Sequence, residues 1–139
     1  MSHRPRIAIT CGEPAGIGPE IALRAALDTA HADCLLVGDA AQLKALAMLI
    51  APARPLRTLH SAADLAQHPN EICVLDCPLA VPSRPGQPDP RNGKAVLAML
   101  DAAIAAAQAG HVDAIATAPV QKSTINDAGV AFTGHTEYL

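Results

Sequence analysis

The stretch RIAITCGEPAGIGPE, residues 6–20, decides the fold because it joins a strand, a tight turn and the start of a helix. Residues 6–11 are short and apolar, as expected for a buried parallel strand. Pro19 suits the first turn of a helix, where no amide hydrogen bond is lost, and Glu20 complements the positive helix end. A strand that passes directly into a helix is the first unit of an alternating α/β fold.

The same alternation continues along the chain. Further buried strands are expected at residues 34–39, 71–76 and 112–118, with a weaker candidate at 54–59. Helical patterns occupy residues 19–30, 40–50, 62–67 and 93–109. Asp39 and Gln42 have the spacing of an acidic capping box, and Gly110 suits the end of the long helix. We expect an α/β fold with alternating strands and helices, a parallel sheet and helices on both faces.

Composition limits the classes of function. A chain of 139 residues is the size of one domain, or of part of a larger one. The net charge of −3, without a run of basic residues, argues against a nucleic-acid or anionic-membrane partner and favours a small molecule. The apolar residues 95–109 are fewer than the ~20 that a membrane span needs, and they include Asp101.

The amino terminus and the cysteines indicate the compartment. Gly12, Glu13 and Pro14 interrupt the first apolar run before it reaches the length of a signal peptide, so we expect a cytoplasmic protein. The four cysteines are Cys11, Cys34, Cys73 and Cys77, and no two form a C-x-x-C motif. Buried reduced thiols are therefore favoured over metal or disulfide roles.

The proline-rich residues 77–94 interrupt the regular alternation and form either a functional loop or a surface crossover. The turn at residues 10–20 lies where α/β proteins place ligand loops. It is not a dinucleotide fingerprint, because Ile21 stands where the third glycine would fall, and no Gly-Lys-Ser/Thr makes it a P-loop. Ligand contact and a turn packed under another segment both remain open, and the residue types favour the packed turn.

Residues 117–139 leave the last expected strand at its carboxyl end, where ligands bind in open α/β sheets. This segment is rich in polar side chains. They are Lys122, Ser123, Thr124, Asn126, Asp127, Thr133, His135, Thr136 and Glu137, and their placement after the strand is a stronger indication than their residue types.

Three motifs together resemble one family. GEPAGIGPE (residues 12–20), followed by INDAG (125–129) and FTGHTEYL (132–139), is similar to the 4-hydroxythreonine-4-phosphate dehydrogenases. The resemblance covers the whole chain but only the amino-terminal part of the family's length. It implies a homodimeric, two-domain α/β architecture like that of the isocitrate and isopropylmalate dehydrogenases. We therefore expect residues 1–139 to be the amino-terminal portion of such a protein, with the carboxyl-terminal portion absent.

The resemblance also implies an activity. NAD or NADP would oxidise a small phosphorylated hydroxy-amino acid, 4-phosphooxy-L-threonine, and loss of carbon dioxide would give 3-amino-2-oxopropyl phosphate for pyridoxal 5'-phosphate biosynthesis. A divalent metal such as zinc, magnesium or cobalt assists in the family. Its three histidine ligands lie in segments that follow these motifs, so the ligands are absent from this chain and the fragment alone is expected to be inactive.

Carried over to this sequence, the resemblance implies that His135 and Thr136 contact the substrate, with Lys122, Asn126 and Asp127 as weaker candidates. It assigns no catalytic, cofactor-binding or metal residue here. Gln121 replaces a histidine that many members have. Two alternatives remain: a paralogue that oxidises 4-phospho-threonate or erythronate phosphate, and a non-catalytic truncated or dimerisation module.

Overall fold

The computed structural model describes residues 4–139. Its strands are β1 (Arg6–Thr10), β2 (Asp33–Gly38), β3 (Leu56–Leu59), β4 (Ile72–Asp76) and β5 (Ala114–Thr117). Its α-helices are α1 (Gly18–Asp28), α2 (Ala40–Ile50), α3 (Gly93–Gln108), α4 (Lys122–Asp127) and α5 (His135–Tyr138), and its 3₁₀ helices are η1 (Ala62–Gln67) and η2 (Pro90–Asn92). All the strands and helices expected from the sequence are present, whereas η2, α4 and α5 were not foreseen.

The five strands form one sheet in the order β3-β4-β2-β1-β5, and every neighbouring pair is parallel. The register places Ile9 of β1 beside Leu36 of β2 and Ala116 of β5. Because all strands run the same way, their carboxyl ends meet at one edge of the sheet. We call this the carboxyl edge, and the opposite one the amino edge.

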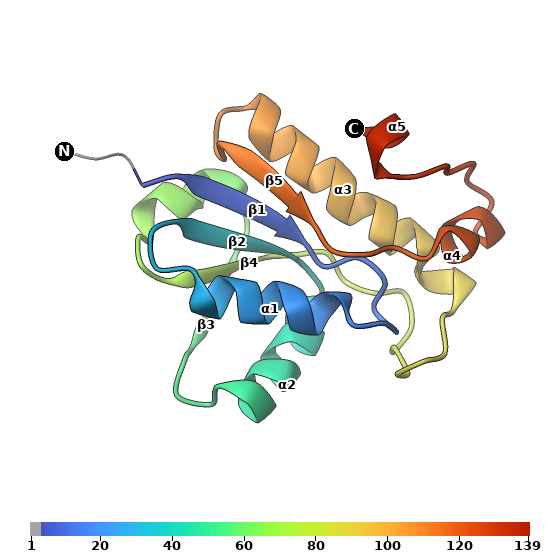
Figure 1. Cartoon of the computed structure of the whole chain (residues 1–139), viewed down its shortest axis with the longest axis horizontal. Helices are drawn as coiled ribbons and strands as arrows, with labels where there is room; N and C mark the ends of the chain where they lie inside the picture. Colours follow the sequence, from blue (N-terminus) through green and yellow to red (C-terminus); the bar gives the residue numbers. More distant parts are fainter. Residues whose placement is uncertain (1–3) are drawn as a thin grey trace.

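Helices cover both faces of the sheet, as expected (Figure 1). Helices α1 and α2 lie on one face, and α3 packs on the other against β1, β2 and β5. This arrangement follows from right-handed crossovers, because the chain moves outward from β1 to β3 and then returns through β4 to β5. All six residues of β2 are buried, so the core lies around this central strand.

The first turn of α2 is fixed by two carboxylates. Asp39 Oδ1 accepts a hydrogen bond from the Gln42 amide at 2.8 Å, as its spacing predicted. Asp76, at the end of β4, accepts one from the Ala40 amide at 2.9 Å. These bonds satisfy amides that have no partner within the helix, and they tie α2 to the end of β4.

The proline-rich residues 77–94 fold back across the carboxyl edge. The buried side chain of Asn92 accepts from the Val81 amide at 3.0 Å and donates to the Val81 carbonyl at 3.1 Å. The Gly86 amide donates to the Ala15 carbonyl at 2.8 Å. This segment is therefore a crossover that packs beside the turn after β1.

The four cysteines are free and buried, as expected. Burial, with a smaller contribution from the nearby Cys77, raises the pKa of the Cys11 thiol to about 12. Burial also raises the pKa of Cys77 to about 11, with a smaller contribution from Asp76. Within residues 4–139, the structure contains no helix that combines the length and apolar character needed to cross a membrane.

Candidate functional site

A pocket of about 400 Å³ opens at the carboxyl edge, where the chain leaves β5. It is lined by Pro119, Val120, Lys122, Thr133, Gly134, His135, Thr136 and Glu137. Three of the five candidate residues, Lys122, His135 and Thr136, therefore line one cavity. Their side chains supply an ammonium, an imidazole and a hydroxyl, all of which can donate hydrogen bonds to an anion.

Lys122 reaches the turn that precedes α5. A Cβ atom built on Gly134 would lie 3.7 Å from Lys122 Cε and 3.8 Å from Lys122 Nζ. Gly134 has a φ of 147°, a conformation that side chains disfavour, so glycine is required for this turn. The same built Cβ would lie 3.1 Å from a carboxylate oxygen of Glu137. The turn thus brings a cation and a carboxylate to the mouth of the pocket.

His135 presents a ring nitrogen without a partner. Its Nε2 atom is buried and forms no hydrogen bond within residues 4–139. The ring meets Phe132 edge to face, with 6.3 Å between ring centroids and an interplanar angle of 88°. Buried polar atoms in native proteins are almost always hydrogen-bonded, so an unpartnered nitrogen here is unusual and makes His135 a candidate for ligand contact.

Aromatic packing anchors the segment that carries His135. Phe132 is buried in a second apolar cluster with residues of α3 and α4, and its ring lies 5.7 Å from that of Tyr138. The Tyr138 hydroxyl donates a hydrogen bond to the carboxylate of Asp101 on α3. This bond raises the pKa of Tyr138. Asp101 is exposed, and its carboxylate fastens α5 to α3.

The other two candidate residues lie outside this pocket. Asn126 Oδ1 accepts a hydrogen bond from the Phe132 amide at 2.8 Å, so its side chain shapes the loop after α4. Asp127 lines a separate hollow with Lys94 and Arg91. Asn126 therefore supports the segment that carries His135, whereas Asp127 faces another part of the surface.

The glycine-rich turn after β1 packs beneath the start of this segment. Gly12 has a φ of 71°, and a Cβ on it would lie 2.2 Å from the Pro119 carbonyl oxygen. The Glu13 amide donates to the same oxygen at 3.0 Å. A Cβ on Gly18 would lie 2.1 Å from the Cys11 carbonyl oxygen. These contacts favour the packed turn between the two possibilities that the sequence left open.

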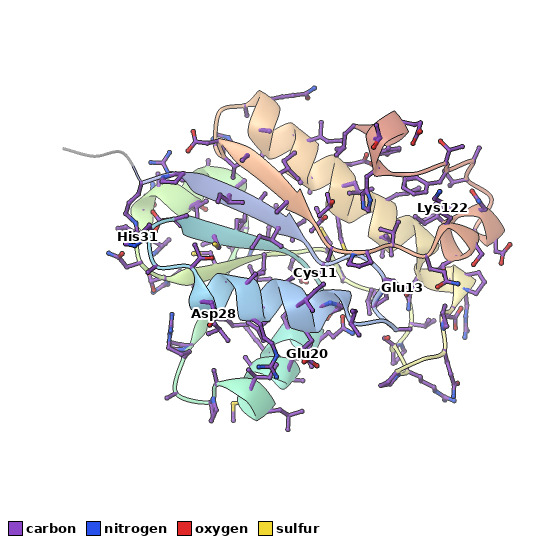
Figure 2. All side chains as sticks on the ribbon, viewed as in Figure 1. Cys11, Glu13, Glu20, Asp28, His31 and Lys122 are labelled. Atoms are coloured by element: carbon purple, nitrogen blue, oxygen red, sulfur yellow. The ribbon has the colours of Figure 1, made fainter. Side chains whose placement is uncertain are left out.

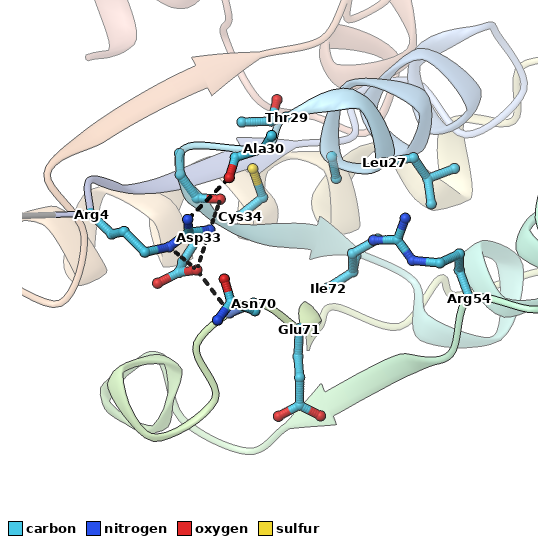
Figure 3. A pocket seen from close by; sticks show the side chains of 12 residues that line it. Arg4, Leu27, Thr29, Ala30, Asp33, Cys34, Arg54, Asn70, Glu71 and Ile72 are labelled. Atoms are coloured by element: carbon cyan, nitrogen blue, oxygen red, sulfur yellow. Dashed lines mark hydrogen bonds and ion pairs between the residues drawn. The ribbon is translucent and has the colours of Figure 1, made fainter.

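A second pocket, of about 260 Å³, lies at the amino edge (Figure 3). Arg4 forms an ion pair with Asp33 there, with 3.0 Å between Nη2 and Oδ1. The backbone amide of Asn70 donates a hydrogen bond to the same Asp33 oxygen at 3.1 Å. Arg4 also donates to the backbone carbonyls of Ala30 and Ala32. Because these groups satisfy one another and lie far from the strand ends that usually bind ligands, the carboxyl-edge pocket is the better candidate.

The described residues do not supply a metal centre. Between residues 4 and 139, no three His, Cys, Asp or Glu side chains come together in a way that could hold a metal ion. A structural or catalytic zinc site needs at least three protein ligands. We therefore assign no metal-dependent step to these residues.

The fold and the pocket define a class. The chain is an open, parallel α/β protein, a class whose members commonly bind ligands outside the carboxyl ends of the strands. Comparison with known proteins makes the assignment specific. The family model for the pyridoxal phosphate biosynthetic protein PdxA matches residues 30–139, and the chain belongs to this family.

Individual relatives agree with this assignment. A 4-hydroxythreonine-4-phosphate dehydrogenase of Janthinobacterium sp. (strain Marseille) is 54% identical over 147 residues, which cover 100% of this chain and 42% of that protein. One from Burkholderia vietnamiensis is 52% identical and is covered over 39% of its length. The crystal structure of the Klebsiella pneumoniae 4-hydroxythreonine-4-phosphate dehydrogenase matches with a TM-score of 0.81 and 38% identity, over 96% of this chain and 42% of that one. The chain thus spans about two fifths of the length of these relatives.

Proposed function

We propose that this chain is the amino-terminal part of a longer, two-domain, homodimeric dehydrogenase in pyridoxal 5'-phosphate biosynthesis. Its substrate would be 4-phosphooxy-L-threonine and its oxidant NAD or NADP. One observation carries the proposal: His135, whose buried Nε2 has no hydrogen-bond partner among the described residues, lines a pocket with Lys122 and Thr136, in a chain of the PdxA family.

The chemistry of the substrate suits these side chains. 4-Phosphooxy-L-threonine carries a phosphate and a carboxylate, and both are strong hydrogen-bond acceptors. In the proposal, His135 and Thr136 donate to one of these groups, and the Lys122 ammonium offsets negative charge at the pocket mouth. Such contacts hold the secondary alcohol in one orientation for reaction.

The proposed reaction balances with a nicotinamide as the oxidant. A hydride leaves the carbinol carbon for the nicotinamide, the hydroxyl loses its proton, and the alcohol becomes a ketone. The resulting β-keto acid loses carbon dioxide and gives 3-amino-2-oxopropyl phosphate. The nicotinamide contacts, and any contacts to the zinc, magnesium or cobalt of the family, would lie in the remainder of the longer protein. The 139-residue chain alone is therefore expected to be inactive.

Steady-state assays on the full-length protein test this function. We expect 4-phosphooxy-L-threonine to reduce NAD or NADP in the presence of a divalent metal, and His135→Asn to lower kcat/KM by about 100-fold. His60→Asn is the matched control, because His60 is exposed and lies outside the pocket. Preferential oxidation of 4-phospho-threonate or erythronate phosphate would instead select the paralogous activity. If the full-length protein oxidised none of these three compounds, the proposal would be contradicted.

A further inference from the structure

Glu13 is a buried carboxylate that the proposed reaction does not use. Its side chain belongs to the glycine-rich turn after β1, and the residue is only 6% exposed. Oε2 accepts a hydrogen bond from the Ala15 amide at 3.1 Å, and Oε1 accepts one from the Thr124 hydroxyl at 2.7 Å. Both donors are neutral. Burial of a carboxylate is costly unless such hydrogen bonds compensate, so a carboxylate at this position calls for a physical explanation.

The Thr124 hydroxyl connects Glu13 to α4. Thr124 is 3% exposed and lies in the first turn of this helix, two residues after Lys122. A helix of six residues is not stable by itself, so tertiary contacts decide where α4 lies. One contact is the bond to Glu13. Another is the close approach of Gly93, where a built Cβ would lie 2.6 Å from the Thr124 carbonyl oxygen.

The placement of α4 in turn sets the position of Lys122. The Lys122 side chain starts from the first residue of the helix and ends beside Gly134, at the mouth of the pocket. A small rotation of α4 would therefore displace the ammonium from the turn before His135. Figure 2 shows Glu13 and Lys122 at the same end of the molecule, next to α4.

The backbone around Glu13 also contacts the chain just before α4, at Pro119. The Glu13 amide donates to the Pro119 carbonyl at 3.0 Å, and Gly12 packs against that carbonyl. The turn after β1 thus holds both Pro119 and Thr124, and Lys122 lies between these two fixed points. This placement explains why the turn contributes to the pocket without lining it.

We infer that Glu13 is a positioning residue for the substrate pocket: through its hydrogen bond to Thr124 it holds α4 so that Lys122 reaches the anionic substrate. The inference rests on the proposed function, because it assigns Lys122 to that substrate. The turn after β1 and the first turn of α4 then form one structural unit, although Glu13 and Thr124 are separated by 111 residues in the sequence.

Variants of Thr124 in the full-length protein test the inference. Thr124→Val removes the donor but keeps the shape, and we expect it to raise KM for 4-phosphooxy-L-threonine about tenfold while kcat changes less than about twofold. Thr124→Ser keeps the hydroxyl and should restore KM to within about twofold of wild type. Ser123→Ala is the matched control, because Ser123 is an exposed neighbour on the same helix and its hydroxyl accepts a hydrogen bond from the Gln121 side chain.

A double-mutant cycle with Lys122→Ala separates positioning from a merely structural role. If Glu13 and Thr124 act through Lys122, Thr124→Val should raise KM no further once Lys122 is already alanine. A full tenfold increase in the Lys122→Ala background would overturn the inference. So would a lower melting temperature of Thr124→Val with an unchanged KM.

Two further measurements test the inference if Thr124→Val does not fold or if turnover cannot be measured. Glu13→Met removes both acceptor oxygens and keeps an unbranched side chain of similar length, so it can take the place of Thr124→Val in the cycle if that variant does not fold. Hydrogen exchange of the amides in residues 121–125 needs no turnover, and we expect it to be faster in Thr124→Val than in Ser123→Ala. Equal exchange in these two variants would overturn the inference, whereas an inactive wild-type enzyme would overturn only the proposed function.

Discussion

Tyr138 and Asp101 are joined by a hydrogen bond from the tyrosine hydroxyl to the aspartate carboxylate, and this bond fastens α5 to α3. Tyr138→Phe removes the donor and keeps the ring contact with Phe132. We expect it to lower the free energy of unfolding by about 1 kcal/mol, measured by urea denaturation. In a cycle with Asp101→Ala, which removes the acceptor, the two losses should not add, whereas strict additivity would contradict a direct bond.

A comparison of Gly12 with Gly86 separates the steric cost of an added Cβ atom from the cost of backbone strain. Their φ values are 71° and 75°, but a Cβ on Gly12 would lie 2.2 Å from the Pro119 oxygen, whereas a Cβ on Gly86 would meet nothing within 4 Å. Gly86→Ala should therefore cost about 1 kcal/mol, the strain of a left-handed residue. Gly12→Ala should cost at least about 3 kcal/mol, because the backbone must also move. Equal losses in thermal denaturation would show that Pro119 does not confine position 12.

Because the thiols are buried, we expect the free energy of unfolding to fall at alkaline pH. The pKa of Cys11 rises from 9.0 in the unfolded chain to about 12 in the fold, so above pH 9 the unfolded state loses this proton and the folded state keeps it. The stabilisation is complete below pH 9 and is lost as the pH rises through about 12. Cys77, with a pKa raised to about 11, acts in the same direction.

Urea denaturation at a series of pH values should therefore show a falling free energy of unfolding above pH 9. Cys11→Ala should reduce the slope of this decrease. A thiol reagent at neutral pH provides an independent check, because all four cysteines are buried. We expect reaction only after denaturant is added, and rapid labelling of the folded protein would contradict the burial.

The edge strand β5 predicts self-association of the isolated chain. It pairs only with β1, and Ala114, Ala116 and Thr117 are exposed. An edge strand without lysine or proline invites pairing with another chain. Ala116→Lys should therefore shift oligomers toward monomer in sedimentation velocity, while Ala53→Lys, which adds the same charge at an exposed position outside the strands, should not. A wild-type chain that is already a monodisperse monomer would contradict this expectation.

The main layers of the fold could be predicted from the sequence because their signals are local. The expected helix at residues 40–50 coincides with α2, and its Asp39 cap is present. Helices α4 and α5 could not be predicted in this way, since each is short and its position depends on tertiary contacts such as the one between Tyr138 and Asp101.

The candidate site was predictable only in part, for a similar reason. The position after the last strand and the family resemblance together indicated His135 and Thr136, which the structure places in one pocket with Lys122. Their contact with substrate remains a prediction. The part played by Glu13 was missed, because its partner Thr124 lies 111 residues away and no local pattern pairs the two.

The parallel sheet also determines how this molecule could be attached to a surface. The turn between α3 and β5 contains Gly110, which has a φ of 80° and nothing within 4 Å of a built Cβ. This turn lies at the amino edge, across the sheet from the pocket that contains His135 (Figure 1). A fluorophore or tether joined there would leave the opposite edge facing solution, so every immobilised copy would present its pocket in the same orientation.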